Sequence, residues 1–178
     1  MKSSKAAFCA VAGALTLLFA SSAHAQSNEW KMEPLQQQLS LIQEAQDLQD
    51  AERREFTCLA LNIYHESRGE NRSGQLAVSH VVLNRMESGR FPRSVCSVIW
   101  QNGQFSWTVR PVGGIIPRDR GAWTASQNLA MEILHGITPE DPTRGATHFY
   151  NVRLVTPDWA RRGQATIRLG PHAFVRMW

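Results

Sequence analysis

The sequence predicts an α+β domain that is mainly helical and carries a small antiparallel β element near its C-terminus. Three observations predict this class. Apolar residues recur with helical spacing over residues 56–68. Residues 73–86 are apolar on most sides, which indicates a central helix. Beyond residue 145, short β-leaning segments are separated by glycine and proline.

The first 25 residues are predicted to be a targeting segment. Lys2 and Lys5 give a basic start, residues 6–20 form an apolar run, and residues 23–25 read Ala-His-Ala, an A-x-A cleavage site. The run is shorter than the roughly 20 residues that a membrane span needs. We therefore expect a Sec-type signal peptide at 1–25, export to the periplasm or cell wall, and no transmembrane segment after its removal. An uncleaved anchor is the alternative.

Residues 26–52 are expected to be a polar amphipathic arm or linker. They are rich in Gln and Glu, and Leu35, Leu39 and Ile42 form only a short apolar stripe. The stripe is too short for a coiled coil. The catalytic domain is expected to cover residues 53–178, a length that supports one ordinary globular core.

The charge balance argues against nucleic-acid binding. Without the first 25 residues the chain has seventeen Lys and Arg against fifteen Asp and Glu, a net charge of only +2. Sixteen of those cations are Arg, whose planar guanidinium binds carboxylates well. This preference fits an anionic, peptide-bearing polymer as a partner, although compositional bias explains it equally well.

The cysteine count is consistent with export. Cys9 lies in the predicted signal peptide, so Cys58 and Cys96 remain as an even pair. In an oxidising compartment we expect them to form a disulfide that links the first helix to the segment after residues 91–92. Two buried free thiols are the alternative.

The first helix places one carboxyl group on its buried face. Its apolar positions follow i, i+3, i+4, i+7 and i+8, at Phe56, Leu59, Ala60, Ile63 and Tyr64. Glu66 comes three residues after Ile63 and shares that face, and Gly69 offers a helix end. Partial burial raises the pKa of a carboxyl group, which suits a general acid near neutral pH. An ion pair with Arg68 or Arg72 is the structural alternative.

The rest of the domain is expected to contain three helices, a loop and a small sheet. The helices are predicted at residues 73–86, 94–100 and 123–135. Residues 101–120 contain three glycines and two prolines, and irregular stretches of that length often serve function. Segments predicted to form the sheet or hairpin are 146–151, 166–169 and 173–176.

The motif H-E-x-x-H is typical of a zinc site in metallopeptidases. His65 and Glu66 match its beginning, but Gly69 occupies the position of the second histidine, so the motif fails. We expect no metal and no cofactor. A discontinuous histidine site, and with it a metal-dependent amidase, stays as an alternative.

Two segments carry side chains suited to a saccharide. Gln104, Ser106 and Trp107 lie on the long loop, and Tyr150 and Asn151 lie in the first tail segment. Aromatic faces stack on sugar rings, and amides hydrogen-bond to hydroxyl and acetamido groups. Core packing is favoured for most of the tryptophans, and Trp107 is the one least expected in the core.

Several short motifs between residues 56 and 178 together resemble the SleB/CwlJ-type cell wall hydrolase family. They are YHESRGE at 64–70, GQ at 74–75, AV at 77–78, VLNR at 82–85, FP at 91–92, GQFS at 103–106 and P-x-W at 157–159. The resemblance implies a lysozyme-like, lytic-transglycosylase-type fold that acts on peptidoglycan. It assigns the catalytic acid to Glu66. This chain has Ser67 where many members have Ala.

The resemblance also explains why one carboxyl group suffices. A lytic transglycosylase would use Glu66 first as acid and then as base on the bond between N-acetylmuramic acid and N-acetylglucosamine. Tyr150, Asn151 and Gln104 would hold the saccharide, and Glu70 is the nearest helper should water attack instead. We expect a monomer. The alternatives are a metal-dependent N-acetylmuramoyl-L-alanine amidase and a non-catalytic peptidoglycan-binding module.

Overall fold

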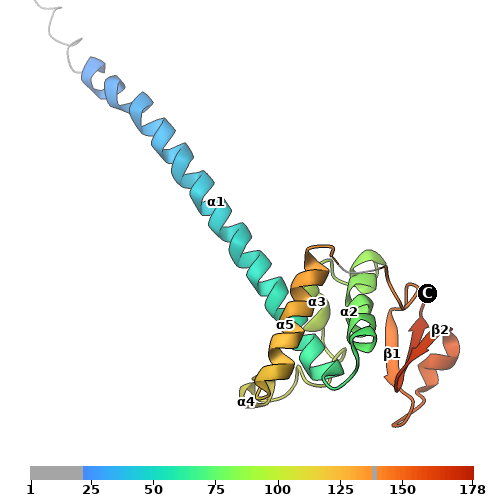
Figure 1. The fold of residues 1–178 in the computed structure, drawn as a ribbon. Coiled ribbons are helices and arrows are strands. Elements are labelled where there is room, and N and C mark those ends of the chain that lie inside the picture. The colour runs from blue at the N-terminus through green and yellow to red at the C-terminus, as the bar shows by residue number, and fades with distance from the viewer. Residues whose placement is uncertain (1–21, 138–139) are drawn as a thin grey trace, which may run out of the picture. The chain divides into compact units, whose positions relative to one another are not determined.

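The computed structural model describes residues 22–137 and 140–178, with side chains from residue 35 onward (Figure 1). The described residues up to Leu48 belong to one unit, and Gln49–Trp178 form a second. Most of the predicted signal peptide, residues 1–21, lies outside the described residues. Over the described part of the chain, no helix combines the length and the apolar character needed to cross a membrane.

Helix α1 (Ser22–Ser67) is continuous across the predicted arm and the first helix of the domain. Residues 35–67 contain neither glycine nor proline and are rich in strong helix formers, so no helix-breaking residue occurs over this stretch of α1. Gly69 then adopts φ +88, a left-handed conformation that glycine tolerates and that ends the helix. Leu35, Leu39 and Ile42 of the predicted stripe are exposed.

The remaining helices lie close to their predicted bounds. They are α2 (Arg72–Glu87), α3 (Val95–Ile99) and α5 (Arg120–Leu134). Side chains cap each of them: Asn71 accepts a hydrogen bond from the Gly74 N–H, Ser94 one from Ser97, and Asp119 one from Ala122. A short helix that the sequence did not predict, α4 (Val112–Ile115), lies inside the expected loop.

The main core lies where α1, α2, α3 and α5 meet. Its fully buried members include Leu59 and Ile63 of α1, Val82 of α2, Ile99 of α3 and Leu129 of α5. The core therefore holds the last turns of α1, and with them Glu66, in a fixed position.

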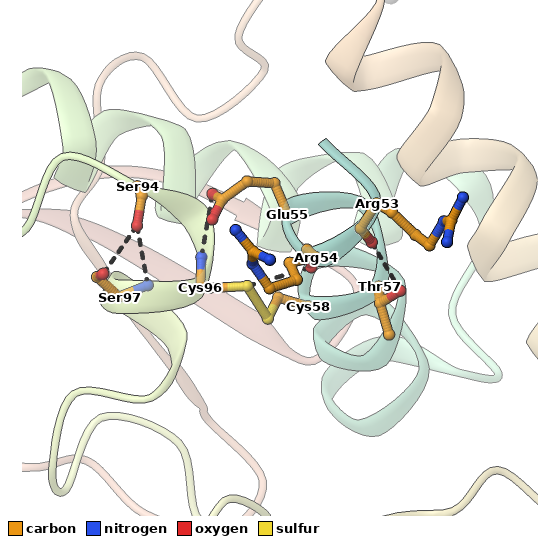
Figure 2. The surroundings of a disulfide bond; sticks show 8 residues. All are labelled: Arg53, Arg54, Glu55, Thr57, Cys58, Ser94, Cys96 and Ser97. Atoms are coloured by element: carbon orange, nitrogen blue, oxygen red, sulfur yellow. Dashed lines mark hydrogen bonds between the residues drawn. A yellow bond between two sulfur atoms is a disulfide. The ribbon is translucent and has the colours of Figure 1, made fainter. Parts of the chain in front are cut away.

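The predicted disulfide between Cys58 and Cys96 is present, with 5.3 Å between the two Cα atoms. It joins α1 to α3 (Figure 2). The Glu55 carboxylate accepts a hydrogen bond of 3.2 Å from the Cys96 N–H, so a second contact ties the same two helices.

Three antiparallel strands form the β element, in the order β1 (His148–Asn151), β3 (His172–Arg176), β2 (Gln164–Leu169). A 3₁₀ helix, η1 (Asp158–Arg162), lies between β1 and β2. The sheet lies against α2 (Figure 1), where Phe174 packs on Ala77, Val78 and Val81. The mainly helical α+β prediction, with its small C-terminal antiparallel sheet, is confirmed.

Candidate active site

Glu66 lines a cavity of about 750 Å³. The cavity is bounded by the end of α1, the loop after α3, strand β1 and η1. Its walls are formed by Glu66, Arg85, Gly103, Gln104, Phe105, Ser106, Val109, Phe149, Tyr150, Asn151, Leu154, Val155, Trp159 and His172. The volume lies within the range of about 300–1,000 Å³ that small-molecule sites occupy.

The Glu66 carboxyl group has no ion-pair or hydrogen-bond partner among the described residues. Arg72 pairs with Glu132 instead, and the Arg68 guanidinium lies over the Tyr64 ring, 4.9 Å from its centroid. The structural alternative, a carboxylate paired with Arg68 or Arg72, is therefore wrong. Burial raises the pKa of Glu66 to about 6, while the charges of Arg110 and Arg85 act in the opposite direction.

Arg85 places a buried positive charge in the wall of the same cavity. The side chain is 4% exposed, and its guanidinium lies 5.2 Å from the centre of the Phe91 ring and 5.3 Å from that of Phe105. Its Nε donates a 2.7 Å hydrogen bond to the Thr147 carbonyl, whereas Nη1 is buried without a partner among the described residues. Burial lowers the pKa of Arg85 to about 10, so the group stays charged at neutral pH.

Asn84, the neighbour of Arg85, fixes the segment that leads into β1. Its Nδ2 lies 3.1 Å from Asp141 Oδ2, 3.0 Å from Thr143 Oγ1 and 2.9 Å from the Ala146 carbonyl. Asp141 also accepts hydrogen bonds from the N–H groups of Thr143 and Gly145. These contacts attach β1, which carries Tyr150 and Asn151, to the end of α2.

The structure brings four predicted site residues together around Glu66. Gln104 and Ser106 line the cavity from the loop, and Tyr150 and Asn151 line it from β1. Gly103, at φ +75, makes the turn that brings this loop to the cavity. Although these positions are 38 to 85 residues from Glu66 in sequence, they line one cavity.

Two predicted site residues lie elsewhere. Trp107 is 1% exposed, stacks on His65 with 4.7 Å between ring centres, and donates its indole N–H to Asn62 at 3.3 Å. The prediction that it faces substrate is wrong, because the loop folds back and Asn62 satisfies the one polar group of the indole. Glu70 is not among the residues that line the cavity. It lies beside Gly170 in the turn between β2 and β3, where a Cβ added to this glycine would be 2.7 Å from the Glu70 Oε2.

A family model described as Cell Wall Hydrolase matches residues 69–175. The chain belongs to this family. The matched range begins three residues after Glu66. The placement of Glu66 in the cavity therefore comes from the structure and not from the family match.

Curated relatives agree with the assignment. A spore cortex-lytic enzyme of Halalkalibacterium halodurans is 32% identical over 116 residues, covering 65% of this chain and 33% of the relative. A spore cortex-lytic enzyme of Bacillus cereus is 32% identical over 118 residues, 66% of this chain and 42% of the relative. The chain thus spans between a third and a half of the length of these relatives.

Solved structures show the same fold. The catalytic domain of the germination-specific lytic transglycosylase SleB from Bacillus anthracis matches with a TM-score of 0.57 and 29% identity, over 68% of this chain and 93% of that one. The catalytic domain of Bacillus cereus SleB matches with a TM-score of 0.55 and 29% identity, over 70% and 91%. The resemblance seen in the motifs is confirmed, and with it the lysozyme-like fold.

Several residues of this cell wall hydrolase were missed as site residues by the sequence reasoning. Arg85 and Trp159 occur in the family motifs but received no role, and Phe149 and His172 were not singled out for the site. The available signal for Arg85 was its place on the buried face of α2, three, four and seven residues after Val82, Val81 and Val78. The sequence predicted that Trp107 would offer an aromatic surface to the cavity, and Trp159 lines the cavity instead. The ring centre of Trp159 lies 5.8 Å from that of Tyr150.

Arg85 is expected to hold down the pKa of Glu66 in this cell wall hydrolase. Replacing Arg85 by Met removes the charge and keeps most of the side-chain length, so the pKa of Glu66 should rise above 6, while the charge of Arg110 still opposes the effect of burial. Carbon-13 NMR titration of the Glu66 carboxyl group measures this directly. Arg85→Lys is the matched control and should preserve most of the wild-type value, and an unchanged or lowered pKa in Arg85→Met would contradict the role.

Proposed function

We propose that this cell wall hydrolase cleaves the glycosidic bond between N-acetylmuramic acid and N-acetylglucosamine in peptidoglycan, as a lytic transglycosylase. One observation carries the proposal: among the described residues that line the cavity, Glu66 is the only acidic one. The relatives support it, because they are named as spore cortex-lytic enzymes and a germination-specific lytic transglycosylase.

The single carboxyl group among the described residues of the cavity wall favours transglycosylation over hydrolysis. Hydrolytic glycosidases ordinarily need two, an acid together with a nucleophile or base. In a transglycosylase, Glu66 gives its proton to the glycosidic oxygen as the bond from C1 of the muramic residue to that oxygen breaks. The C6 hydroxyl of the same sugar then bonds to C1, and the Glu66 carboxylate takes the hydroxyl proton. The product is a 1,6-anhydro sugar, no water is consumed, and Glu66 ends as it began.

The rest of the cavity suits a sugar chain. Trp159 and Tyr150 offer aromatic surface, and Gln104 and Asn151 offer amides to hydroxyl and acetamido groups. Arg85 keeps a positive charge beside Glu66 while the latter is a carboxylate between its two proton transfers. We assign Gln104, Ser106, Tyr150, Asn151 and Trp159 to substrate binding and Glu66 to catalysis.

The proposal includes export. Peptidoglycan lies outside the cytoplasmic membrane, a disulfide such as Cys58–Cys96 persists in oxidising compartments, and residues 1–25 have the pattern of a signal peptide. We propose cleavage after residue 25, a polar arm at 26–52 and a catalytic domain at 53–178 that works as a monomer in the periplasm or at the cell wall.

Activity should fall as the pH rises above about 6. A general acid must enter the reaction protonated, and Glu66 loses its proton with a pKa of about 6. We expect kcat/KM on soluble glycan strands to drop about tenfold for each pH unit well above 6. A profile measured from pH 4.5 to 9 tests this, and a constant kcat/KM between pH 6 and 8.5 would contradict it.

The deciding experiment identifies the reducing end of the product. Purified sacculi are digested with the protein, and the released fragments are examined by mass spectrometry. We expect 1,6-anhydromuramic ends and the same yield with a chelator present. Hydrated reducing ends would indicate a muramidase. Chelator-sensitive release of free peptides would indicate the amidase, and no fragments at all would indicate a binding module. Over the described residues, no three His, Cys, Asp or Glu side chains gather as a metal site.

A further inference from the structure

A second cavity, of about 490 Å³, lies beside the end of α1. We call it the arginine cavity, because Arg68, Arg110 and Arg118 line it together with Tyr64, His65 and Asp119. None of these residues lines the Glu66 cavity. The proposed reaction leaves this space without a role.

The cavity carries an excess of positive charge. In the described part of the chain, none of the three arginine side chains forms an ion pair. Asp119 is the only acidic group among the described residues of the wall, and its Oδ1 already accepts the Ala122 N–H at the start of α5. Three guanidinium groups against one engaged carboxylate make a site for anions.

The other polar groups of the wall are held in place by the protein. The Tyr64 hydroxyl accepts the N–H groups of Arg118 and Asp119, each at 3.1 Å. His65 Nε2 lies 2.8 Å from the Ile115 carbonyl, which only accepts, so Nε2 carries the proton of that bond. Burial lowers the pKa of His65, and the ring is neutral at pH 7. The Arg68 guanidinium lies over the Tyr64 ring, and its N–H groups, with those of Arg110 and Arg118, are the donors left to bind a ligand.

The two cavities are neighbours. His65 and Glu66 are consecutive in α1, and each lines one of them. Arg110 lines the arginine cavity, and its charge acts on both His65 and Glu66. The loop after α3 also lines both, with Gln104, Ser106 and Val109 at the Glu66 cavity and Arg110 at the arginine cavity.

We propose that the arginine cavity binds a carboxylate of the peptide stem carried by the glycan strand whose sugars occupy the Glu66 cavity. This inference rests on the proposed function. The stem is attached to the muramic sugar at which the bond is cut, so it leaves the strand close to Glu66. Its free carboxylates match the planar fork of guanidinium groups. The cavity would therefore make the enzyme favour peptide-bearing strands over bare ones.

The test compares three forms of the same soluble strands: native, with all stem carboxylates converted to amides, and with the stems removed so that only the lactyl carboxylate remains. For the wild-type protein we expect KM to be about tenfold higher on the amidated and the stripped strands than on native ones, with kcat little changed. Equal KM on native and amidated strands would overturn the proposal. Stripped strands that bind as tightly as native ones would overturn it as well, because the anion would then be the lactyl group.

The double variant Arg68→Gln/Arg118→Gln tests whether the arginine cavity causes the preference for native over amidated strands. It should raise KM on native strands about tenfold and become indifferent to amidation. Arg93→Gln/Arg168→Gln removes the same charge from two exposed sites outside both cavities and should behave as wild type. A preference that survives in the first variant, or disappears equally in the second, would overturn the proposal. If the proposed function itself fails, the wild-type protein yields no anhydro ends from any of the three substrates.

Discussion

Glu66→Gln is expected to lower the release of anhydro-muropeptides by about 10²- to 10⁴-fold, the contribution typical of a general acid or base. The amide keeps the shape of the side chain and cannot supply the proton that the leaving oxygen needs. Since Glu66 is the only acidic residue among the described residues of the cavity wall, no neighbour is placed to replace it. The measurement is the initial rate of fragment release from purified sacculi at pH 5.5, followed by mass spectrometry.

The loss should not come from unfolding. The pKa of Glu66 is raised from 4.5 to about 6 in the folded protein, so the stability gained from keeping the proton is present below pH 4.5 and is lost as the pH rises through 6. The total is at most about 2 kcal/mol. Glu66→Gln has no such ionisation, and at pH 7.5 its Tm should equal or exceed that of the wild type.

A matched control separates the acid from general charge effects. Glu87, at the end of α2, is exposed and lies outside the Glu66 cavity. Glu87→Gln changes the net charge by the same amount and should keep wild-type activity. If Glu66→Gln still cleared sacculi at the wild-type rate, the catalytic assignment would be wrong.

Local patterns were enough to predict much of the helical framework. The spacing of Leu59 and Ile63 defines the buried face of a helix, and Gly69 marks its end, so the side of α1 on which Glu66 lies follows from a short segment. The change of period after residue 145 indicates strands for the same local reason. The pairing of Cys58 with Cys96 followed from counting the cysteines that remain in a chain expected to be exported.

Other features depend on contacts between distant segments. Trp107 resembles a ligand-stacking residue in its loop, and its burial becomes evident only when His65 and Asn62 of α1 are seen beside it. The unpartnered Nη1 of Arg85 likewise depends on where β1 and the loop lie. The continuity of α1 was missed because the apolar pattern fades after Ile42. The residues after Ile42 are still strong helix formers, although they present no apolar face.

The disulfide is expected to contribute on the order of 4 kcal/mol to the stability of the domain. Cys58 and Cys96 are 38 residues apart, and the chain-entropy model gives about this value for a loop of that length. The variant Cys58→Ala/Cys96→Ala should therefore melt on the order of 10–20 °C below the oxidised wild type. Thermal unfolding at pH 7 measures the difference.

Reduction supplies the control that isolates the covalent bond from the packing of its two ends. Wild-type protein with both thiols reduced keeps the sulfur atoms, including the one of buried Cys58, and should lose most of the same stability. A difference of less than about 1 kcal/mol between oxidised and reduced protein would contradict the prediction. Because Glu66 lies two helical turns after Cys58, the bond to α3 also holds the turn that carries the acid. Below its lowered Tm, the reduced protein should nevertheless keep the raised pKa of Glu66, because the core residues Leu59 and Ile63 still pack that turn in place.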